Sequence, residues 1–233
     1  MKNSRFSLST VAVMAAFSSI SAAQAAPAAD AAQAPNESWY VGLSAGQSST
    51  TFSSSDFSYA SAVVTESSDR NKTGGKFFMG YDFNKNWAVE LGYAGLGRPK
   101  FKYDGVGVAS GASAHREVRE ESWNLVAKGS LPINEQFGLF GKLGATWNRS
   151  QASFNLNSTN AAFTAAVGGT SYTNTKTRSD VLVGVGAQFY FNKNVAVRVE
   201  YEDFGRFGSY GVKTDSTGTT RASMWSAGVS YNF

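Results

Sequence analysis

The chain has 233 residues, a small net charge of +4, 24 glycines, 14% aromatic residues and no cysteine. The lack of cysteine excludes disulfide bonds, thiolate catalysis and cysteine-ligated zinc. The scattered basic residues give no support to nucleic-acid binding, and abundant glycine and aromatic residues with few helix-forming runs favour an all-β fold.

The N-terminal region has the pattern of an export signal. Lys2 and Arg5 precede an apolar run at 11–17, and the small-residue sequence Ala23-Gln24-Ala25 follows. This order is typical of a secretory signal peptide, and the apolar run is too short to span about 30 Å of hydrocarbon. The predicted organisation is a signal peptide at 1–25, a flexible leader at 26–37 and one folded domain at 38–233.

The rest of the chain is dominated by alternation of apolar with small or polar residues. Such a period of two indicates strands with two different faces. In the last segment Trp225, Val229 and Tyr231 share one face, while Ser226 and Ser230 share the other. Eight segments of this kind lie, in chain order, at about 39–49, 76–83, 87–94, 123–128, 139–148, 181–191, 195–202 and 225–233.

The connections between these segments alternate in length. Three are short and rich in turn-forming residues, at Asn84–Asn86, Pro132–Gln136 and Asn192–Asn194. The others are long and polar, at about 52–72, 98–116, 150–176 and 206–220. Short turns at one end and long loops at the other are typical of outer-membrane β-barrels, whose long loops are extracellular.

The composition of the two faces indicates which one meets lipid. The second face is rich in glycine and carries few charges, which suits the narrow interior of an eight-stranded barrel. Aromatic residues near strand ends suggest girdles at the membrane surfaces. These residues are Trp39, Tyr40, Trp87, Phe189, Phe191, Tyr231 and Phe233. We therefore predict an eight-stranded antiparallel up-and-down transmembrane β-barrel, with a soluble lipocalin-type barrel, apolar inside, as the alternative.

Several motifs resemble the transmembrane domain of the outer membrane protein A (OmpA) family. They are Trp39-Tyr40-Val41-Gly42, Trp87-Ala88-Val89-Glu90-Leu91-Gly92-Tyr93 with Leu96-Gly97-Arg98, Val195-Ala196-Val197-Arg198-Val199-Glu200-Tyr201, and Gly228-Val229-Ser230-Tyr231-Asn232-Phe233. The resemblance covers nearly the whole predicted mature chain. Members of the family usually continue into a peptidoglycan-binding domain, whereas this chain stops at Phe233, so a role in cell-wall tethering is not expected.

The resemblance implies a cluster of paired charges that gates the lumen. Glu90, Lys128 and Arg198 match members of that cluster, and Lys142 keeps a basic residue. Gln188 stands at the position of the second acidic partner, which puts an alternating-partner gate in doubt, and Glu200 is the residue that could compensate. The resemblance also implies that the C-terminal residues Val229, Tyr231 and Phe233 form the signal for the barrel-assembly machinery.

These observations lead us to expect a monomeric outer-membrane protein that supports envelope integrity, with a narrow ion-conducting pore as an extension of that role. The alternatives are binding of host or phage ligands by the long loops, and a lipid A-modifying enzyme. The enzyme is disfavoured because the single histidine, His115, shows no constrained spacing to a nucleophile such as Ser113. A channel for hydrophobic solutes lacks an obvious apolar lumen. We expect no cofactor, catalytic site or metal site, and membrane lipid and lipopolysaccharide as partners.

Overall fold

The computed structural model describes the chain in seven stretches: 37–51, 63–68, 71–98, 100–106, 113–157, 171–208 and 220–233. The predicted signal peptide at 1–25 and the leader up to residue 36 lie outside the described residues. No helix within these stretches is both long and apolar enough to cross a membrane.

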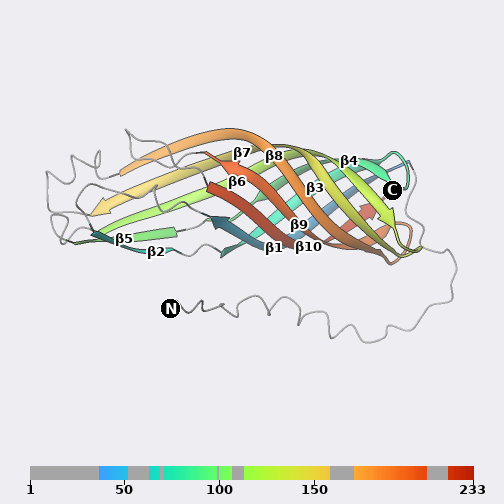
Figure 1. Cartoon of the computed structure of the whole chain (residues 1–233), viewed down its shortest axis with the longest axis horizontal. Coiled ribbons are helices and arrows are strands. Elements are labelled where there is room, and N and C mark those ends of the chain that lie inside the picture. Colours follow the sequence, from blue (N-terminus) through green and yellow to red (C-terminus); the bar gives the residue numbers. More distant parts are fainter. Residues whose placement is uncertain are drawn as a thin grey trace, which may run out of the picture. The chain divides into compact units, whose positions relative to one another are not determined.

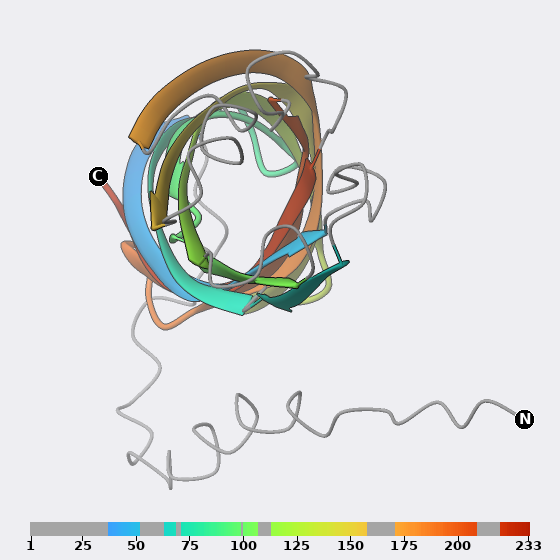
Figure 2. The same cartoon turned by 90° about the vertical axis from the view of Figure 1, so that its left-hand side faces the viewer.

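Within these stretches, ten antiparallel strands build one sheet that closes on itself (Figures 1 and 2). Eight of them form the ring, because β2 and β5 lie outside the cycle closed by the β1–β10 and β6–β7 pairings. The predicted eight-stranded barrel is confirmed. The strands are β1 (Ser38–Thr51), β2 (Val63–Ser68), β3 (Asn71–Asp82), β4 (Trp87–Gly95), β5 (Lys100–Val106), β6 (Ser113–Pro132), β7 (Phe137–Asn157), β8 (Ser171–Tyr190), β9 (Val195–Phe207) and β10 (Thr220–Asn232).

The sheet extends further into the predicted loops than the sequence indicated. β5 pairs with the beginning of β6, and β2 pairs with β5, so the segments expected as loops at 52–72 and 98–116 contain strands. β7 continues to Asn157 and β8 begins at Ser171, which shortens the loop expected at 150–176. The added part of β8 is almost wholly polar and carries no apolar alternation to mark it. β5 and the added part of β7 do alternate, with Phe101 and Tyr103 in the first and Ala152, Phe154 and Leu156 in the second, but their surroundings rich in polar residues led to their assignment as loops. The backbone ladder continues through all of these segments.

The predicted assignment of the two faces is confirmed along the barrel. Leu43 and Val229 point outward and are 66% and 51% exposed, whereas Arg198 is 2% exposed inside. Val197 and Val199 also lie on the outer face, in alternation with Arg198 and Glu200. Apolar side chains therefore cover the outside of the barrel, which excludes the lipocalin-type alternative.

Aromatic contacts lie at both edges of the apolar band, as predicted, but one residue assigned to this girdle lies elsewhere. Trp39–Tyr81 and Phe189–Phe191 contacts lie at the short-turn edge, and Tyr201–Trp225 lies at the other. Tyr40, predicted to belong to the girdle, is instead 2% exposed and points into the barrel. It must do so because Trp39 faces outward and successive strand residues point to opposite faces.

Each short turn is built around an asparagine. The Oδ1 atom of Asn134 accepts hydrogen bonds from the backbone N–H groups of Gln136 and Phe137, at 2.9 and 2.7 Å. Asn84 and Asn192 accept the two equivalent N–H groups in the other turns. An asparagine side chain that bonds the backbone two and three residues on stabilises a tight turn between antiparallel strands.

Replacing one of these asparagines tests the contribution of the turn. Asn134→Ala removes the acceptor of two backbone N–H groups, and we expect it to lower the free energy of unfolding by about 1 kcal/mol. Urea unfolding in lipid vesicles, followed by tryptophan fluorescence, measures the change. Glu135→Ala, at an exposed position in the same turn, is the matched control and should leave stability nearly unchanged. Equal midpoints for the two variants would contradict this account of the turn.

Candidate functional site

A network of buried charges lies inside the barrel. Salt bridges link four carboxylates and four cations among the described residues, all directed inward from β3, β4, β6, β7 and β9. These side chains are Lys76, Asp82, Glu90, Lys128, Lys142, Arg198, Glu200 and Glu202. Their formal charges cancel, as burial in a narrow lumen requires.

Glu90 is bonded from several sides at once. Arg198 donates to its two carboxylate oxygens at 2.8 and 3.2 Å, and Lys142 lies 2.6 Å away. The hydroxyl of Tyr40 donates to Oε1 at 2.9 Å, while Lys128 is further off at 3.9 Å. Charge-assisted bonds of this kind offset the loss of hydration that burial of a carboxylate entails.

Lys142 connects Glu90 to a second pair of acids. Glu200 and Glu202 lie two residues apart on the inner face of β9, and Lys142 donates to them at 2.6 and 3.2 Å. Lys76 bonds both carboxylates from the opposite wall, reaching Glu202 at 2.5 Å. Lys142 therefore contacts three carboxylates. Glu202 has two cationic neighbours, and Glu200 has a third in Arg198 at 3.5 Å.

Aromatic rings enclose the guanidinium of Arg198. Its Cζ atom lies 3.5 Å from the centroid of the Phe78 ring and 5.6 Å from that of Phe140. The rings reach this position because Gly42 and Gly186 have no side chain, and a Cβ at either residue would overlap them. A cation over an aromatic face gains electrostatic stabilisation, which adds to that of the salt bridges.

The structure places most of the predicted cluster together, with one exception. Glu90, Lys128, Lys142, Arg198 and Glu200 all belong to the network. Gln188 does not, because its amide donates to the Tyr190 hydroxyl at 2.8 Å.

Three further members were missed by the sequence reasoning. These are Lys76, Asp82 and Glu202, and Asp82 lies 3.6 Å from Lys128. Their inward direction could be read from the alternation, but their partners across the lumen could not.

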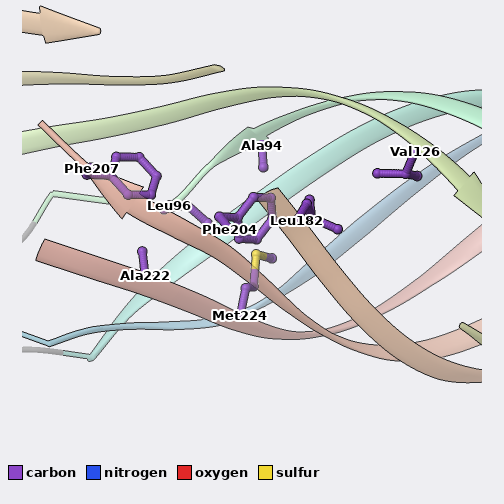
Figure 3. Close-up of a cluster of buried hydrophobic side chains, with 8 residues drawn as sticks. All are labelled: Ala94, Leu96, Val126, Leu182, Phe204, Phe207, Ala222 and Met224. Carbon is purple, nitrogen blue, oxygen red and sulfur yellow. The ribbon is translucent and has the colours of Figure 1, made fainter. Parts of the chain in front are cut away.

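An apolar layer lies beyond the network, toward the long-loop end of the barrel (Figure 3). In β9, Phe204 and Phe207 follow Glu202, and in β4 Ala94 precedes Leu96, which lies just past the end of the strand. The expectation that the lumen lacks an apolar section was therefore wrong. The buried cluster comprises Ala94, Leu96, Val126, Leu182, Phe204, Phe207, Ala222 and Met224, none more than 2% exposed.

The residues considered for catalysis are arranged differently from the sequence expectation. The backbone of His115 lies in β6, opposite Lys102 and Asn155, rather than in a loop. Its side chain lies outside the described residues. Within the described part of the chain, no three His, Cys, Asp or Glu side chains are grouped so that they could hold a metal ion. The arrangement at the centre serves to compensate charge.

Removing one acid from the network tests how much stability depends on it. Glu90→Gln leaves Arg198 and Lys142 without one of their carboxylates, and we expect the free energy of unfolding to fall by about 3–5 kcal/mol. Denaturant unfolding in vesicles measures this change. Gln188→Ala, at a buried polar position outside the network, should cost distinctly less. Equal losses for the two variants would show that the charges contribute no more than ordinary packing.

Comparison with known proteins agrees with this architecture. The model of the OmpA-like transmembrane domain matches residues 34–233. The chain is 28% identical to outer membrane protein A of Serratia marcescens over 207 residues, which are 86% of this chain and 51% of that protein. It is also 28% identical to outer membrane protein P5 of Haemophilus influenzae over 209 residues, covering 86% and 55% of the two chains.

A solved structure shows the same fold. The outer membrane protein OprG of Pseudomonas aeruginosa aligns with 88% of this chain and 99% of its own, with a TM-score of 0.51 and 14% identity. The chain spans about half the length of the two relatives named above. Because the family model covers most of the sequence, the chain belongs to the family of OmpA-like transmembrane domains and is an outer-membrane β-barrel.

Proposed function

We propose that this protein is a closed structural barrel that supports the integrity of the outer membrane and carries extended strands to the cell surface. The observation behind the proposal is the filled lumen. A balanced charge network and an apolar layer lie in series along the barrel, so an ion crossing it would have to displace both.

The charges themselves favour a structural role. Lys142 and Arg198 each bind two or more carboxylates, and both side chains are only 1% exposed. Breaking such a buried contact leaves a charge without compensation, which is costly in a low-dielectric interior. The network therefore acts as a fixed core that replaces the apolar core of a soluble protein.

The apolar layer adds a second barrier. Phe204, Phe207 and Leu182 are fully buried, and an apolar constriction excludes water and ions by dewetting. This layer distinguishes the proposed closed barrel from a pore that a single rearrangement of salt bridges could open.

Ion passage is the second candidate function. Lys142 contacts Glu90, Glu200 and Glu202 at the same time, so carboxylates could exchange partners without any cation losing all of its contacts. An exchange of partners would be the step that opens the network. It would have to be accompanied by movement of the apolar layer.

Conductance in planar bilayers separates the two candidates. We expect the wild-type protein and Lys128→Ala to give equally negligible currents, because the apolar layer is present in both. Single-channel recording at low and high voltage is the measurement. A steady wild-type current that changes in Lys128→Ala would overturn the closed-barrel proposal and support a gate.

Surface binding is the remaining role. β6 and β7 pair continuously from Ser113–Asn157 to Pro132–Gly138, beyond the part of the barrel where β4 pairs with β6. In this extension β5 pairs with β6, β2 pairs with β5 and the beginning of β8 pairs with β7, so a sheet of five strands continues past the ring. A rigid scaffold of this kind is suited to presenting loops to host or phage ligands.

Replacing residues 158–170 with a short Gly-Ser linker tests whether the envelope role needs this loop. In a strain lacking the protein, we expect both the wild type and the replacement to restore resistance to detergent with EDTA, because the barrel is retained. Heat-modifiable gel migration provides the folding control. Restoration by the wild type alone, together with lost adhesion to host cells, would favour loop binding as the main function.

The C-terminal strand has the features expected of a contact for the barrel-assembly machinery. Val229, Tyr231 and Phe233 lie on the outer face and are each at least half exposed. The backbone N–H of Phe233 donates to the carbonyl of Trp39, so the last residue helps to close the sheet. We propose these three residues as the contact for the assembly machinery, and a single barrel as the functional unit.

A further inference from the structure

Two arginines face each other on the outside of the barrel. Arg206 in β9 and Arg221 in β10 are directly paired across the sheet. Their side chains are 55% and 67% exposed. Like charges at directly opposed positions of an antiparallel pair are destabilising, so this pairing needs a compensating reason.

A β-bulge turns Arg206 to the outer surface. The register between β9 and β10 shifts between Arg221 and Ser223, and Phe204 and Gly205 are buried in succession. Gly205 adopts a φ of 71°, a conformation that glycine tolerates and that bulges often use. Without the extra residue, position 206 would share the inner face with Phe204. The bulge therefore brings the second arginine to the surface opposite the first.

Two aspartates fix the orientation of the arginines. Asp180 accepts both the backbone N–H and the Nε–H of Arg206, at 2.9 and 2.8 Å. Asp203 accepts the Nε–H of Arg221 at 2.9 Å and the backbone N–H of Gly205 at 2.8 Å. Among the described residues, the terminal nitrogens of neither guanidinium make a hydrogen bond. Within the described part of the chain, both guanidinium groups are thus held through Nε.

The cations lie further out than the anions. The side chains of Asp180 and Asp203 are 17% and 23% exposed, less than half the values for the arginines they bind. A ligand that approaches from outside therefore meets guanidinium groups before carboxylates. A phosphate accepts several N–H donors, so arginines at two directly paired positions on one surface suit a ligand of this kind.

The position along the barrel indicates where that phosphate comes from. Tyr201 and Trp225, whose rings are 4.9 Å apart, belong to the aromatic edge near the long-loop end. Arg221 and Arg206 lie a few residues beyond them, away from the apolar band. Aromatic girdles mark the headgroup level of a membrane, so the arginines stand where lipid phosphates lie.

We propose that Arg206 and Arg221 clamp a phosphate group of lipid A, the phosphorylated glycolipid in the leaflet at the long-loop end. The clamp is preformed by the Gly205 bulge and the two aspartates. A bound phosphate bridges β9 and β10, so lipid binding and the stability of this part of the sheet are coupled.

Binding to lipid A in detergent micelles tests the clamp with the full, folded protein. We expect Arg206→Gln/Arg221→Gln to weaken binding of bisphosphorylated lipid A at least tenfold. Dephosphorylated lipid A should bind the wild type as weakly as it binds this variant. Native mass spectrometry and fluorescence titration provide the measurement, and heat-modifiable migration verifies folding of each variant.

The matched control removes two other outward arginines. Arg119 and Arg149 are exposed on β6 and β7, and neither is paired with another arginine across the sheet. Arg119→Gln/Arg149→Gln changes the net charge equally and should bind lipid A within twofold of the wild type. An equal loss in this control, unchanged binding in Arg206→Gln/Arg221→Gln, or competition by inorganic phosphate alone at equal concentration would overturn the clamp.

Discussion

In a bilayer, backbone N–H and C=O groups have no water to bond with, so a sheet that crosses it must pair every strand with two neighbours. The β1–β10 and β6–β7 pairings satisfy this requirement by closing the ring. Closure with eight strands leaves an interior only wide enough for side chains. The alternation of the two faces then determines which residue types suit each position, because outward residues meet hydrocarbon and inward residues meet one another.

The interior meets this constraint in two ways along its length. Near the middle, buried charges are compensated by charges of opposite sign, by hydroxyl donors such as that of Tyr40 and by the aromatic rings around Arg198. Toward the long-loop end, Phe204, Phe207 and their neighbours replace ion pairs with apolar contacts. The bulge at Gly205 serves both faces, since it lets Phe204 and Phe207 point inward together while Arg206 turns outward.

The sequence was sufficient for the properties that depend on alternation. Strand number, the outer face and the inward direction of Glu90, Arg198 and Glu200 all follow from a period of two. Partners across the lumen, such as Lys76 with Glu202, depend on register and strand tilt, which no local pattern encodes. The bulge was missed because it breaks the period of two, and the extension of β8 because it is almost wholly polar. The inward position of Tyr40 does follow from the alternation, and it was missed because the residue was assigned to the girdle by its aromatic type alone.

The direction of the side chains in β10 tests the central claim most directly. The chain has no cysteine, so single cysteines at 225–227 and 229–231 can each carry a nitroxide label without background. In lipid vesicles, accessibility to molecular oxygen, which concentrates in hydrocarbon, should be high at 225, 227, 229 and 231 and low at 226 and 230. The opposite phase, with labels at 226 and 230 accessible from the lipid, would contradict a barrel with its apolar face outward.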